Sequence, residues 1–486
     1  MQRHNFGRNI ELRPATFYEP RSGQEVVDIL DRHRGQKIRV IGRLHSWSRI
    51  LESEEVLLDL RHLNQVVPQL DGDLKSAQVG AGCQIKRLLS ELSKKSGWTI
   101  PSVGFVAEQS IAGAISTGTH GSGKHSLSHY VLSVRIARYD SVTGRARIDE
   151  INEGHALRAA RCSLGCLGVI LSVRMQCRES YRVEEHFHEY STLAEVMNTE
   201  TTYPLQQFYL VPWRWTYFVQ HRREMEDPIS QTAILYRWYR FLIIDVAMHF
   251  PILLVARWFP SRRLLHFVYR YLVPSFVIRN WRSVDHSTRQ LVMGHELFRH
   301  IEIELFVQKR HVESAMLFVT DTLCLTGSEQ GAAIPRDPLF QSQIAQAGTE
   351  GELMDLAGVY DHHFPICVRK ILTDDTLISM ASSGIKSSAG IECTVPDRIN
   401  EPWYAITLTS YVSPDKRQPF FQVACFLAKS MSKLYGARPH WAKLCTLPAH
   451  ELRELYPNFQ EFSRQCRSSD PMGVFQNHWT EELIKY

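Results

Sequence analysis

A short stretch near the N-terminus, RVIGRLHSWSRI at residues 39–50, has a residue pattern that suits an anionic ligand. Residues 39–41 read as the end of a strand, and Gly42 allows a tight turn because glycine has no Cβ to clash at unusual dihedral angles. His45 and Ser46 follow on a loop, and such a loop can offer several backbone N–H groups to an anion. The stretch becomes a binding loop only if the rest of the chain supplies further contacts for a large ligand.

A second stretch, SVGFVAEQSIAGAISTGTHGSGKHSLSH at residues 102–129, is rich in small residues. Its small side chains allow a backbone to approach a ligand closely, and its hydroxyl and N–H groups suit pyrophosphate oxygens. The alternative is a flexible glycine-rich loop, but Ile111, Ala114 and Ile115 keep a buried pattern running through it. The stretch matches neither the P-loop nor the Rossmann glycine motif. Its glycines are Gly104, Gly113, Gly118, Gly121 and Gly123.

The elements around these loops predict an α/β arrangement of short strands. Residues 25–34 have apolar positions at helical spacing, and residues 37–42 are strand-like. Residues 85–97 form an amphipathic helix pattern that ends at Gly97, where a C-terminal glycine is expected. Residues 24–175 therefore predict a domain in which strands and helices alternate.

Length and composition restrict the class of protein. A chain of 486 residues predicts two domains, and a net charge of +5 is too small to indicate nucleic-acid binding. The ten cysteines lack paired spacing, and Cys162 and Cys166 have no complementary second pair, so we expect reduced thiols, no metal site and a cytoplasmic protein. The N-terminus has no apolar signal core, and the absence of eighteen successive uncharged apolar residues argues against a spanning helix.

The order VIGRLHSWS, SIAGAISTGTHGSG, LGCLGVILSV resembles the flavin domain of the vanillyl-alcohol-oxidase-type FAD enzymes. Within them the chain is similar to the aldonolactone oxidase group, which includes gulonolactone, galactonolactone and arabinonolactone oxidases and the alditol oxidases. The resemblance implies an α+β fold with FAD as the cofactor. It implies an FAD-binding domain at residues 10–178, an antiparallel-sheet cap domain for the substrate at 179–430, and a segment at 431–486 that returns to the flavin.

That group carries Gly-x-Gly-His-Ser at the first loop, where Gly42 and His45 match and Leu44 replaces the second glycine. In many members the histidine is bonded covalently to the flavin 8α-methyl carbon, so the resemblance makes His45 the expected attachment point. The alternative is that His45 only forms hydrogen bonds in the loop. The cofactor-binding residues implied by the resemblance are Gly42, Arg43, Leu44, His45, Ser46, Ser116, Thr117, Gly118, His120, Gly121, Gly168, Val169, Ile170 and Asn477.

The resemblance resumes near the C-terminus with RPHWAK at residues 438–443 and a closing segment at 455–479. Flavin oxidation of an alcohol requires a positive or hydrogen-donating group beside the developing alkoxide. By resemblance, His440 and Lys443 are catalytic residues of this kind.

The stretch FPICVRK supplies a third expected catalytic residue, Arg369. The family carries Pro-x-Glu-x-Arg there, and Cys367 stands in place of the glutamate. Strand alternation puts Cys367 and Arg369 on one face, and we expect Glu392 or Thr394 to face the same cavity, with Glu392 replacing the missing carboxylate. The alternative for Arg369 is a structural ion pair with Asp374 or Asp375.

Residues 231–282 combine eight arginines with one aspartate and many aromatic residues. Pro251, Pro260 and Pro274 are expected to divide the segment into short helices. Arginines flanking apolar and aromatic faces suit a membrane interface, whereas the other interpretation is a pair of cap-domain helices packed on a sheet or a second subunit. Single-stranded nucleic acid is not expected as a partner of a flavin enzyme.

The sequence thus predicts an FAD-dependent oxidoreductase that oxidises the CH–OH group of a sugar lactone, alditol or related sugar by hydride transfer to flavin N5. The electron acceptor is oxygen or another carrier, and the protein is cytoplasmic or peripherally bound to a membrane. Two alternatives stay open. Leu44 and Cys367 allow a catalytically altered flavin-binding scaffold, and residues 231–282 allow a membrane-associated dehydrogenase of a lipid-linked sugar.

Overall fold

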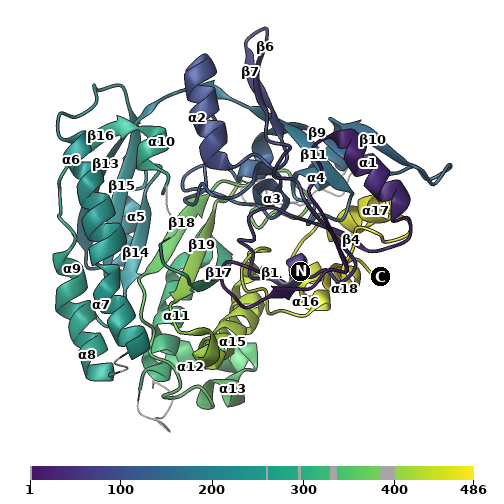
Figure 1. The fold of residues 1–486 in the computed structure, drawn as a ribbon. Coiled ribbons are helices and arrows are strands. Elements are labelled where there is room, and N and C mark those ends of the chain that lie inside the picture. The colour runs from purple at the N-terminus through teal and green to yellow at the C-terminus, as the bar shows by residue number, and fades with distance from the viewer. Residues whose placement is uncertain (1–2, 259–260, 294–296, 329–336, 384–399, 486) are drawn as a thin grey trace.

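The computed structural model describes residues 3–258, 261–293, 297–328, 337–383 and 400–485. Helices and sheets are mixed, and the eight-stranded sheet occupies the left and centre of the molecule in Figure 1. The smaller sheets of the N-terminal part lie above and to its right. The predicted α+β class is therefore confirmed.

The N-terminal part contains a parallel three-stranded sheet, in the order β3-β5-β4, and an antiparallel five-stranded sheet, in the order β10-β9-β11-β7-β6. The strands of the first are β3 (Thr16–Tyr18), β4 (Ile38–Ile41) and β5 (Val56–Asp59). The strands of the second are β6 (Val66–Asp71), β7 (Leu74–Gly80), β9 (Val131–Tyr139), β10 (Ala146–Ile151) and β11 (Val169–Gln176). Two short pairs join β1 (Arg3–His4) to β2 (Glu11–Leu12) and β8 (Trp98–Thr99) to β12 (Arg178–Glu179).

The helices of this part begin and end where their residues predict. In α1 (Gly23–Arg32) the side chain of Ser22 accepts a hydrogen bond from Glu25 N–H, and α2 (Ile85–Ser96) ends at Gly97, whose φ is +71°. Both helices were predicted from their apolar spacing, and both predictions are confirmed. The other elements are η1 (Arg49–Leu51), α3 (Ile111–Ser116), η2 (Leu127–Tyr130) and α4 (Gly154–Arg161).

The large sheet is antiparallel, in the order β16-β13-β15-β14-β18-β19-β17-β20. Its register aligns Cys367 on β18 with Thr407 on β19, and Thr407 with Glu304 on β17. Three residues far apart in the sequence thus form one row across the sheet. The strands are β13 (Arg182–Tyr190), β14 (Gln207–Val211), β15 (Thr216–Met225), β16 (Ser283–His286), β17 (Ile301–Gln308), β18 (Ile366–Ile371), β19 (Trp403–Ser410) and β20 (Arg438–Pro439).

Helices cover this sheet at its β17 side and at its far edge. The long helices α11 (Val312–Thr326) and α15 (Gln418–Tyr435) pack against β17, and α12 packs against α15. The remaining elements of this part are α5 (Leu193–Asn198), α10 (Ser287–Gln290), η6 (Lys309–His311), α12 (Pro338–Ala347), α13 (Glu350–Met354) and η7 (Pro414–Lys416).

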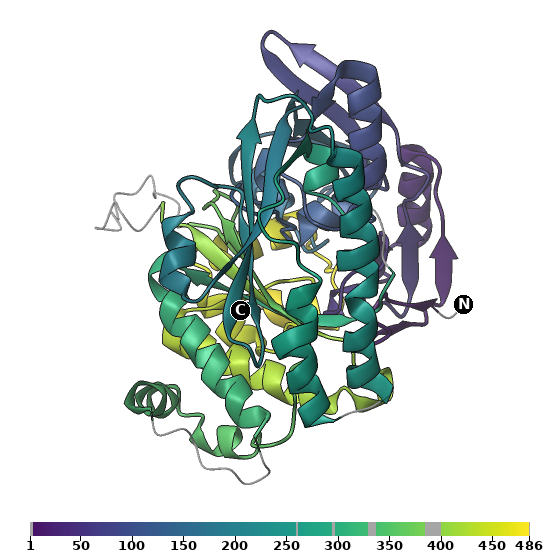
Figure 2. The ribbon, with the colours of Figure 1, turned by 90° about the vertical axis from the view of Figure 1, so that its left-hand side faces the viewer.

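Residues 233–258 and 262–275 form two helices that lie side by side and that we call the helical hairpin (Figures 1 and 2). The first helix is α6 (Ala233–Tyr239), η3 (Arg240–Ala247), α7 (His249–Leu253) and η4 (Leu254–Trp258), and the second is α8 (Arg262–Phe267), η5 (Val268–Leu272) and α9 (Val273–Ser275). The prediction that Pro251 and Pro274 break the segment is wrong, because both lie inside helical runs. The π-type hydrogen bonding of η3 and η5 shifts the bonding register before each proline, so the missing N–H is tolerated. Pro260 lies outside the described residues.

The inner face of the hairpin is fixed to the sheet, and its outer face is exposed. Tyr236, Ile252 and Tyr269 are buried, and buried Glu185 of β13 pairs with Arg240 at 3.3 Å and with Arg222 at 2.6 Å. The first helix is 26 residues long and apolar enough to cross a membrane by length and composition alone, and only 17% of its most apolar stretch is buried. The exposed apolar side chains of the hairpin are Ile234, Leu235, Trp238, Leu242, Phe250, Leu254, Trp258, Leu264, Phe267, Tyr271 and Leu272.

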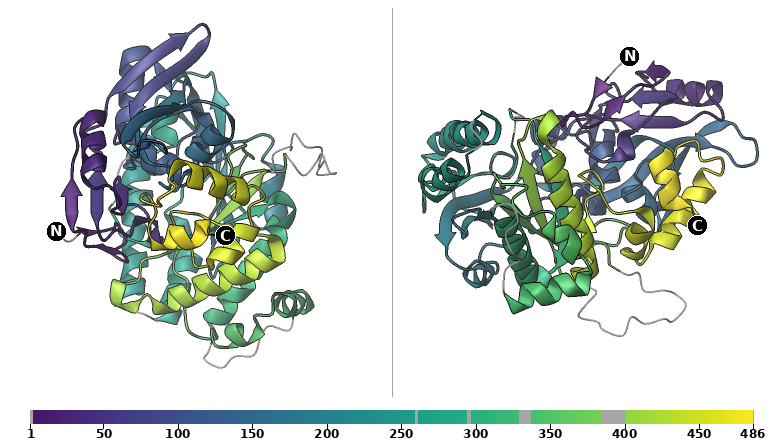
Figure 3. Two further views of the ribbon diagram at one scale, coloured as in Figure 1. Left: turned by 90° about the vertical axis from the view of Figure 1, so that its right-hand side faces the viewer. Right: turned by 90° about the horizontal axis from the view of Figure 1, so that it is seen from below.

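The C-terminal helices return to the N-terminal sheets (Figure 3). Ile38 N–H donates to Val474 O at 2.9 Å, and the Lys37 ammonium donates to Gly473 O at 2.7 Å. These contacts join residues more than four hundred positions apart. The helices of this segment are α16 (Ala449–Glu454), α17 (Phe459–Ser469) and α18 (His478–Ile484).

Candidate active site

Three separate stretches of the N-terminal part line one cavity, which we call the cofactor cavity. They are the loop after β4, the segment around α3, and the turn that leads into β11. The residues predicted to contact the cofactor that line it are Gly42, Arg43, Leu44, His45, Ser46, Ser116, Thr117, Gly168 and Ile170. The three sequence stretches that the resemblance assigns to FAD binding therefore line the same cavity.

The chemistry of the lining fits FAD. Among the described residues the lining includes Arg39 and Arg43 but no carboxylate, which suits the negative charge of a pyrophosphate. Small residues such as Ala112, Gly113 and Gly165 bring the backbone close to the cavity. These residues would hold the dinucleotide.

Leu44 keeps the backbone conformation that a glycine would have at this position. Its φ is +58°, which lies in the left-handed region that glycine adopts at low cost. Its carbonyl accepts a hydrogen bond from Phe6 N–H at 2.8 Å, and this contact helps to hold the conformation. The departure from the family motif therefore leaves the shape of the loop intact.

Four of the residues predicted to bind the cofactor line neither this cavity nor the next one: Gly118, Gly121, Val169 and Asn477. Gly118 has a φ of +74°, and a Cβ there would lie 2.9 Å from Met380 Cε. Asn477 caps α18 and donates to Arg49 O at 2.8 Å and to Glu52 O at 3.1 Å. Gly121 instead lines a different pocket, together with Arg369.

A second cavity of about 270 Å³, the central cavity, adjoins the first, and His45, Gln109 and Ala442 line both. His45 thus lies at the junction, where an attachment point for the flavin ring would be needed. The polar floor of the central cavity gathers the predicted Arg369, His440, Lys443 and Cys367 with His120. Two carboxylates that were not predicted, Glu302 and Glu304, complete this floor.

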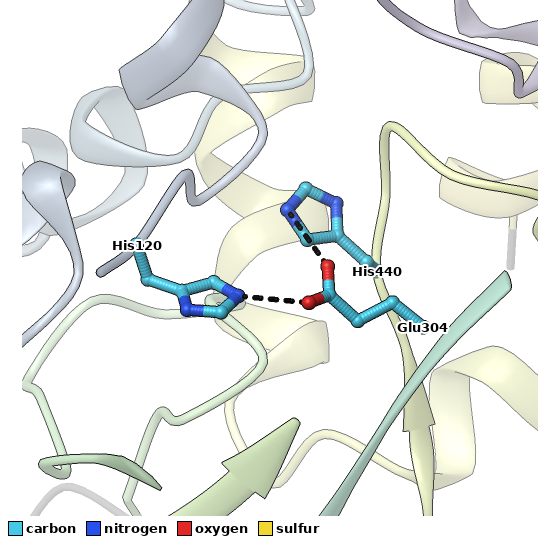
Figure 4. Close-up of side chains that lie close together, drawn as sticks. All are labelled: His120, Glu304 and His440. Atoms are coloured by element: carbon cyan, nitrogen blue, oxygen red, sulfur yellow. Dashed lines mark ion pairs between the residues drawn. The ribbon is translucent and has the colours of Figure 1, made fainter. Parts of the chain in front are cut away.

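Glu304 is the centre of the floor (Figure 4). Its Oε1 accepts hydrogen bonds from Arg369 at 2.6 Å and from Thr407 Oγ1 at 2.8 Å, and it lies 3.4 Å from His120 Nε2. Burial by itself would raise the pKa of Glu304, but the charge of Arg369 and the contact with His120 hold it well below its usual range. Its Oε2 has no hydrogen-bond partner among the described residues and lies 3.9 Å from His440 Nε2.

The two histidines differ in how their ring nitrogens are used. His440 Nδ1 accepts the Ala442 N–H at 3.0 Å, so the proton of the neutral ring is on Nε2, toward Glu304. Burial lowers the pKa of His440 to about 3, and the ring is therefore neutral at pH 7. His120 Nδ1 donates to Gly121 O at 3.0 Å. In the neutral ring, the Nε2 that faces Glu304 therefore carries a lone pair. The His120 ring thus presents Nε2 to the Glu304 carboxylate at 3.4 Å.

The ligand atoms of His120, Glu304 and His440 all lie within 4.8 Å of one another, a spacing that would also suit a metal ion. However, the guanidinium of Arg369 already supplies a positive charge to Glu304. We therefore assign the cluster to proton handling.

Lys443 and Glu302 form a second charged pair beside this cluster. The Lys443 ammonium pairs with Glu302 and lies 4.3 Å from the centre of the Trp47 ring, and His300 Nε2 is 3.0 Å from the other oxygen of Glu302. Burial opposes the charge of Glu302, but Lys443 and His300 lower the pKa of this carboxyl well below its ordinary value. Lys443 therefore faces the cavity as a fixed positive charge.

The ion-pair partner of Arg369 was not among the residues considered from the sequence. Glu392 and Thr394 lie outside the described residues, and the partner of Arg369 is Glu304 rather than Asp374 or Asp375. Asp374 accepts hydrogen bonds from Ser126 and Ser379, and Asp375 pairs with Arg161, so both are used elsewhere. A signal was present in IEIELF at residues 301–306, where two glutamates alternate with apolar residues on one strand.

Comparison with known proteins agrees with this arrangement. A family model described as an FAD binding domain matches residues 14–143, and one described as D-arabinono-1,4-lactone oxidase matches residues 173–483. A long-chain alcohol oxidase from an uncultured marine euryarchaeote is 51% identical over 484 residues, which cover 100% of this chain and 97% of that protein. The L-gulonolactone oxidase of Bos taurus is 25% identical, with 99% and 97% covered. Among solved structures, cholesterol oxidase from B. sterolicum has a TM-score of 0.70 at 15% identity, with 99% of this chain and 96% of that chain covered, which shows a shared fold.

Proposed function

The chain belongs to the D-arabinono-1,4-lactone oxidase family and is an FAD-dependent oxidoreductase, and from this premise we propose that it oxidises the CH–OH group of a long, largely apolar alcohol. One observation carries the choice of substrate. The central cavity has a charged floor and, away from it, walls built mainly of apolar side chains. The apolar wall residues are Phe187, Val211, Phe218, Ile244, Met248, Val273, Val277 and Phe364.

The polar groups along the walls are largely used by one another. Gln207 donates to Gln220 Oε1 at 2.7 Å and to the Tyr209 hydroxyl at 2.5 Å. Burial raises the pKa of Cys367 to about 11, so this residue offers a neutral thiol where the family has a carboxylate. A polyol would need several hydrogen-bond partners along its length, and an alkyl chain needs none. The relative named as a long-chain alcohol oxidase supports the same choice.

FAD, when bound, accepts the hydride from the alcohol carbon. The chain supplies the rest of the chemistry. We assign Glu304 Oε2 as the acceptor of the substrate O–H, and the Glu304–His120 pair as the group that takes its proton. Arg369 and Lys443 stabilise the alkoxide that develops on the substrate oxygen, and His440 directs its Nε2–H toward Glu304 Oε2, with 3.9 Å between the two atoms. We also propose that His45 attaches the flavin covalently, as its place between the two cavities would allow.

The second candidate is a sugar lactone or alditol, as expected from the sequence. The charged floor would suit hydroxyl groups, and L-gulonolactone oxidases are among the relatives. A scaffold without catalysis is disfavoured because Arg369, Glu304, His440 and Lys443 converge on one cavity. We propose oxygen as the electron acceptor, on the basis of relatives named as oxidases.

We propose further that the protein attaches to the surface of a membrane through the outer face of the helical hairpin. Trp258 is 75% exposed and Phe250 60%, and both belong to a stripe of apolar side chains at spacings of about four residues. The same hairpin contributes Ile244, Met248 and Val273 to the central cavity from its inner face. An apolar alcohol dissolved in the bilayer would therefore meet the wall of the cavity directly. Because the inner face is packed on the sheet, the hairpin lies on the bilayer and does not cross it.

The length of the apolar cavity gives a direct test of the substrate class. For a series of 1-alkanols, kcat/KM should rise about fourfold with each methylene until the cavity is filled, because burial of one methylene is worth about 0.8 kcal/mol. In Val273→Trp, kcat/KM should stop rising at a shorter alcohol, because the larger side chain fills part of the cavity. Val273 lines the cavity and is only 3% exposed.

The matched control is Leu272→Trp, because Leu272 is the adjacent residue on the exposed side of the same helix. It should leave the chain-length profile unchanged. A profile that is flat with chain length in the unaltered protein, or that shifts equally in both variants, would argue against an alkyl-binding cavity.

A further inference from the structure

A pocket at the end of the first hairpin helix is lined by arginines from four stretches of the chain. We call it the arginine pocket. Its other lining residues include Leu253 of the hairpin and Phe298, and Leu297 at its edge is half exposed. The arginines are Arg8, Arg257, Arg299 and Arg417.

The positive charge of this pocket has no carboxylate counterpart. Among the residues that the structure describes, none of the four arginines has a carboxylate oxygen within 4.0 Å. Arg257 belongs to the arginine-rich segment at residues 231–282, and most of the other arginines of that segment do have a carboxylate partner. Arg237, Arg240, Arg262, Arg279 and Arg282 pair with Asp285, Glu185, Asp361, Glu189 and Glu184, respectively. Four arginines with no carboxylate neighbour among the described residues therefore line one pocket.

Two of the four guanidinium groups are held in place by backbone carbonyls. Arg257 Nε donates to Tyr411 O at 2.7 Å, and Arg417 donates to Gly7 O and, at 3.4 Å, to Val412 O. Arg417 is 4% exposed, and burial together with the charge of Arg257 lowers the pKa of Arg417 to about 10. Positive groups kept close together against their mutual repulsion indicate a site that receives an anion. Arginine is suited to phosphate because its planar fork can donate two parallel hydrogen bonds.

We propose that the arginine pocket binds the phosphate of an anionic phospholipid headgroup while the hairpin lies on the bilayer. The inference rests on the proposed membrane attachment and adds a site of defined chemistry to it. The surroundings support a lipid as the source of the phosphate. Leu254 and Trp258 are exposed on the same helix as Arg257, and Leu297 is exposed beside Arg299. Apolar side chains and guanidinium groups are thus placed together, as the acyl and headgroup layers of a bilayer require.

The test is co-sedimentation of the FAD-loaded protein with vesicles of phosphatidylcholine alone and with vesicles that also contain phosphatidylglycerol. The pocket variant is Arg8→Gln with Arg299→Gln, because both side chains are exposed and neither is used to hold the backbone. The control variant removes the same charge far from the helical hairpin, by Arg32→Gln in α1 and Arg464→Gln in α17, two helices on the right in Figure 1, whereas the hairpin lies on the left. Flavin content is measured in all variants as a check of folding.

We expect the unaltered protein and the control variant to bind the anionic vesicles more tightly than the phosphatidylcholine vesicles. The pocket variant should bind the anionic vesicles about 30-fold more weakly, which is the effect of two basic residues near an anionic leaflet. Its binding to phosphatidylcholine should be unchanged. Equal losses in the pocket and control variants, or no preference of the unaltered protein for anionic lipid, would overturn the pocket but leave the apolar attachment standing. Failure to bind any vesicle would overturn both.

Discussion

Glu304→Gln is expected to slow the reduction of bound FAD by substrate by about 100- to 1000-fold, because the loss of one preorganised charged contact in a transition state costs about 3–4 kcal/mol. The amide can still accept the hydrogen bonds of Arg369 and Thr407, so the sheet should retain its structure. It can neither carry the negative charge nor take the proton of the alcohol. Stopped-flow measurement of flavin reduction in the absence of oxygen gives the rate without interference from reoxidation.

Glu200→Gln is the matched control for this substitution. Glu200 is also a buried carboxylate that contacts the large sheet, where it accepts from the Tyr404 hydroxyl at 2.7 Å, but it does not line the central cavity. Its replacement should leave the rate of flavin reduction unchanged. A normal rate in Glu304→Gln, with normal flavin content, would remove Glu304 from the proton transfer and leave the histidines to be tested in its place.

The second large effect is expected at the first loop. If His45 is the attachment point, FAD remains with the unaltered protein after acid precipitation, whereas His45→Ala releases nearly all of it. His45 is the residue of that loop that lines both cavities, so it is the one that can reach the flavin ring. Ser46→Ala should keep the bound flavin, because Ser46 lines only the cofactor cavity. Release of FAD from the unaltered protein on denaturation would show that the flavin is not covalently bound, which leaves the alternative that His45 only forms hydrogen bonds in the loop.

Local pattern was sufficient to predict much of the N-terminal part. The apolar spacing of residues 85–97 and the glycine at its end predicted α2, and the structure confirms both the helix and the left-handed Gly97 that follows its last residue. The first loop was also predicted, because a glycine turn after a strand is determined by neighbouring residues. Features that depend on residues adjacent in the sequence are therefore the ones that sequence reasoning recovers.

The carboxylate of the site could not be predicted in the same way. Glu304, Thr407 and Cys367 are brought into one row by the pairing of β17, β19 and β18, and this register depends on the packing of the whole sheet. Without the register, Glu392 looked like the nearest substitute for the missing glutamate. The continuity of the hairpin through Pro251 was missed for a related reason, since π-type bonding compensates for the proline only in the folded helix.

The most direct test of the account is anaerobic mixing of the FAD-loaded protein with two substrates, 1-dodecanol and L-gulono-1,4-lactone, while the visible absorbance of the flavin is followed. The account predicts that 1-dodecanol bleaches the flavin rapidly at low concentration and that the lactone does so slowly or not at all. The apolar walls of the central cavity and the thiol of Cys367 are the reasons for this order. Rapid bleaching by the lactone, with no reaction of the alcohol, would contradict the proposed substrate class and identify a sugar lactone as the substrate instead.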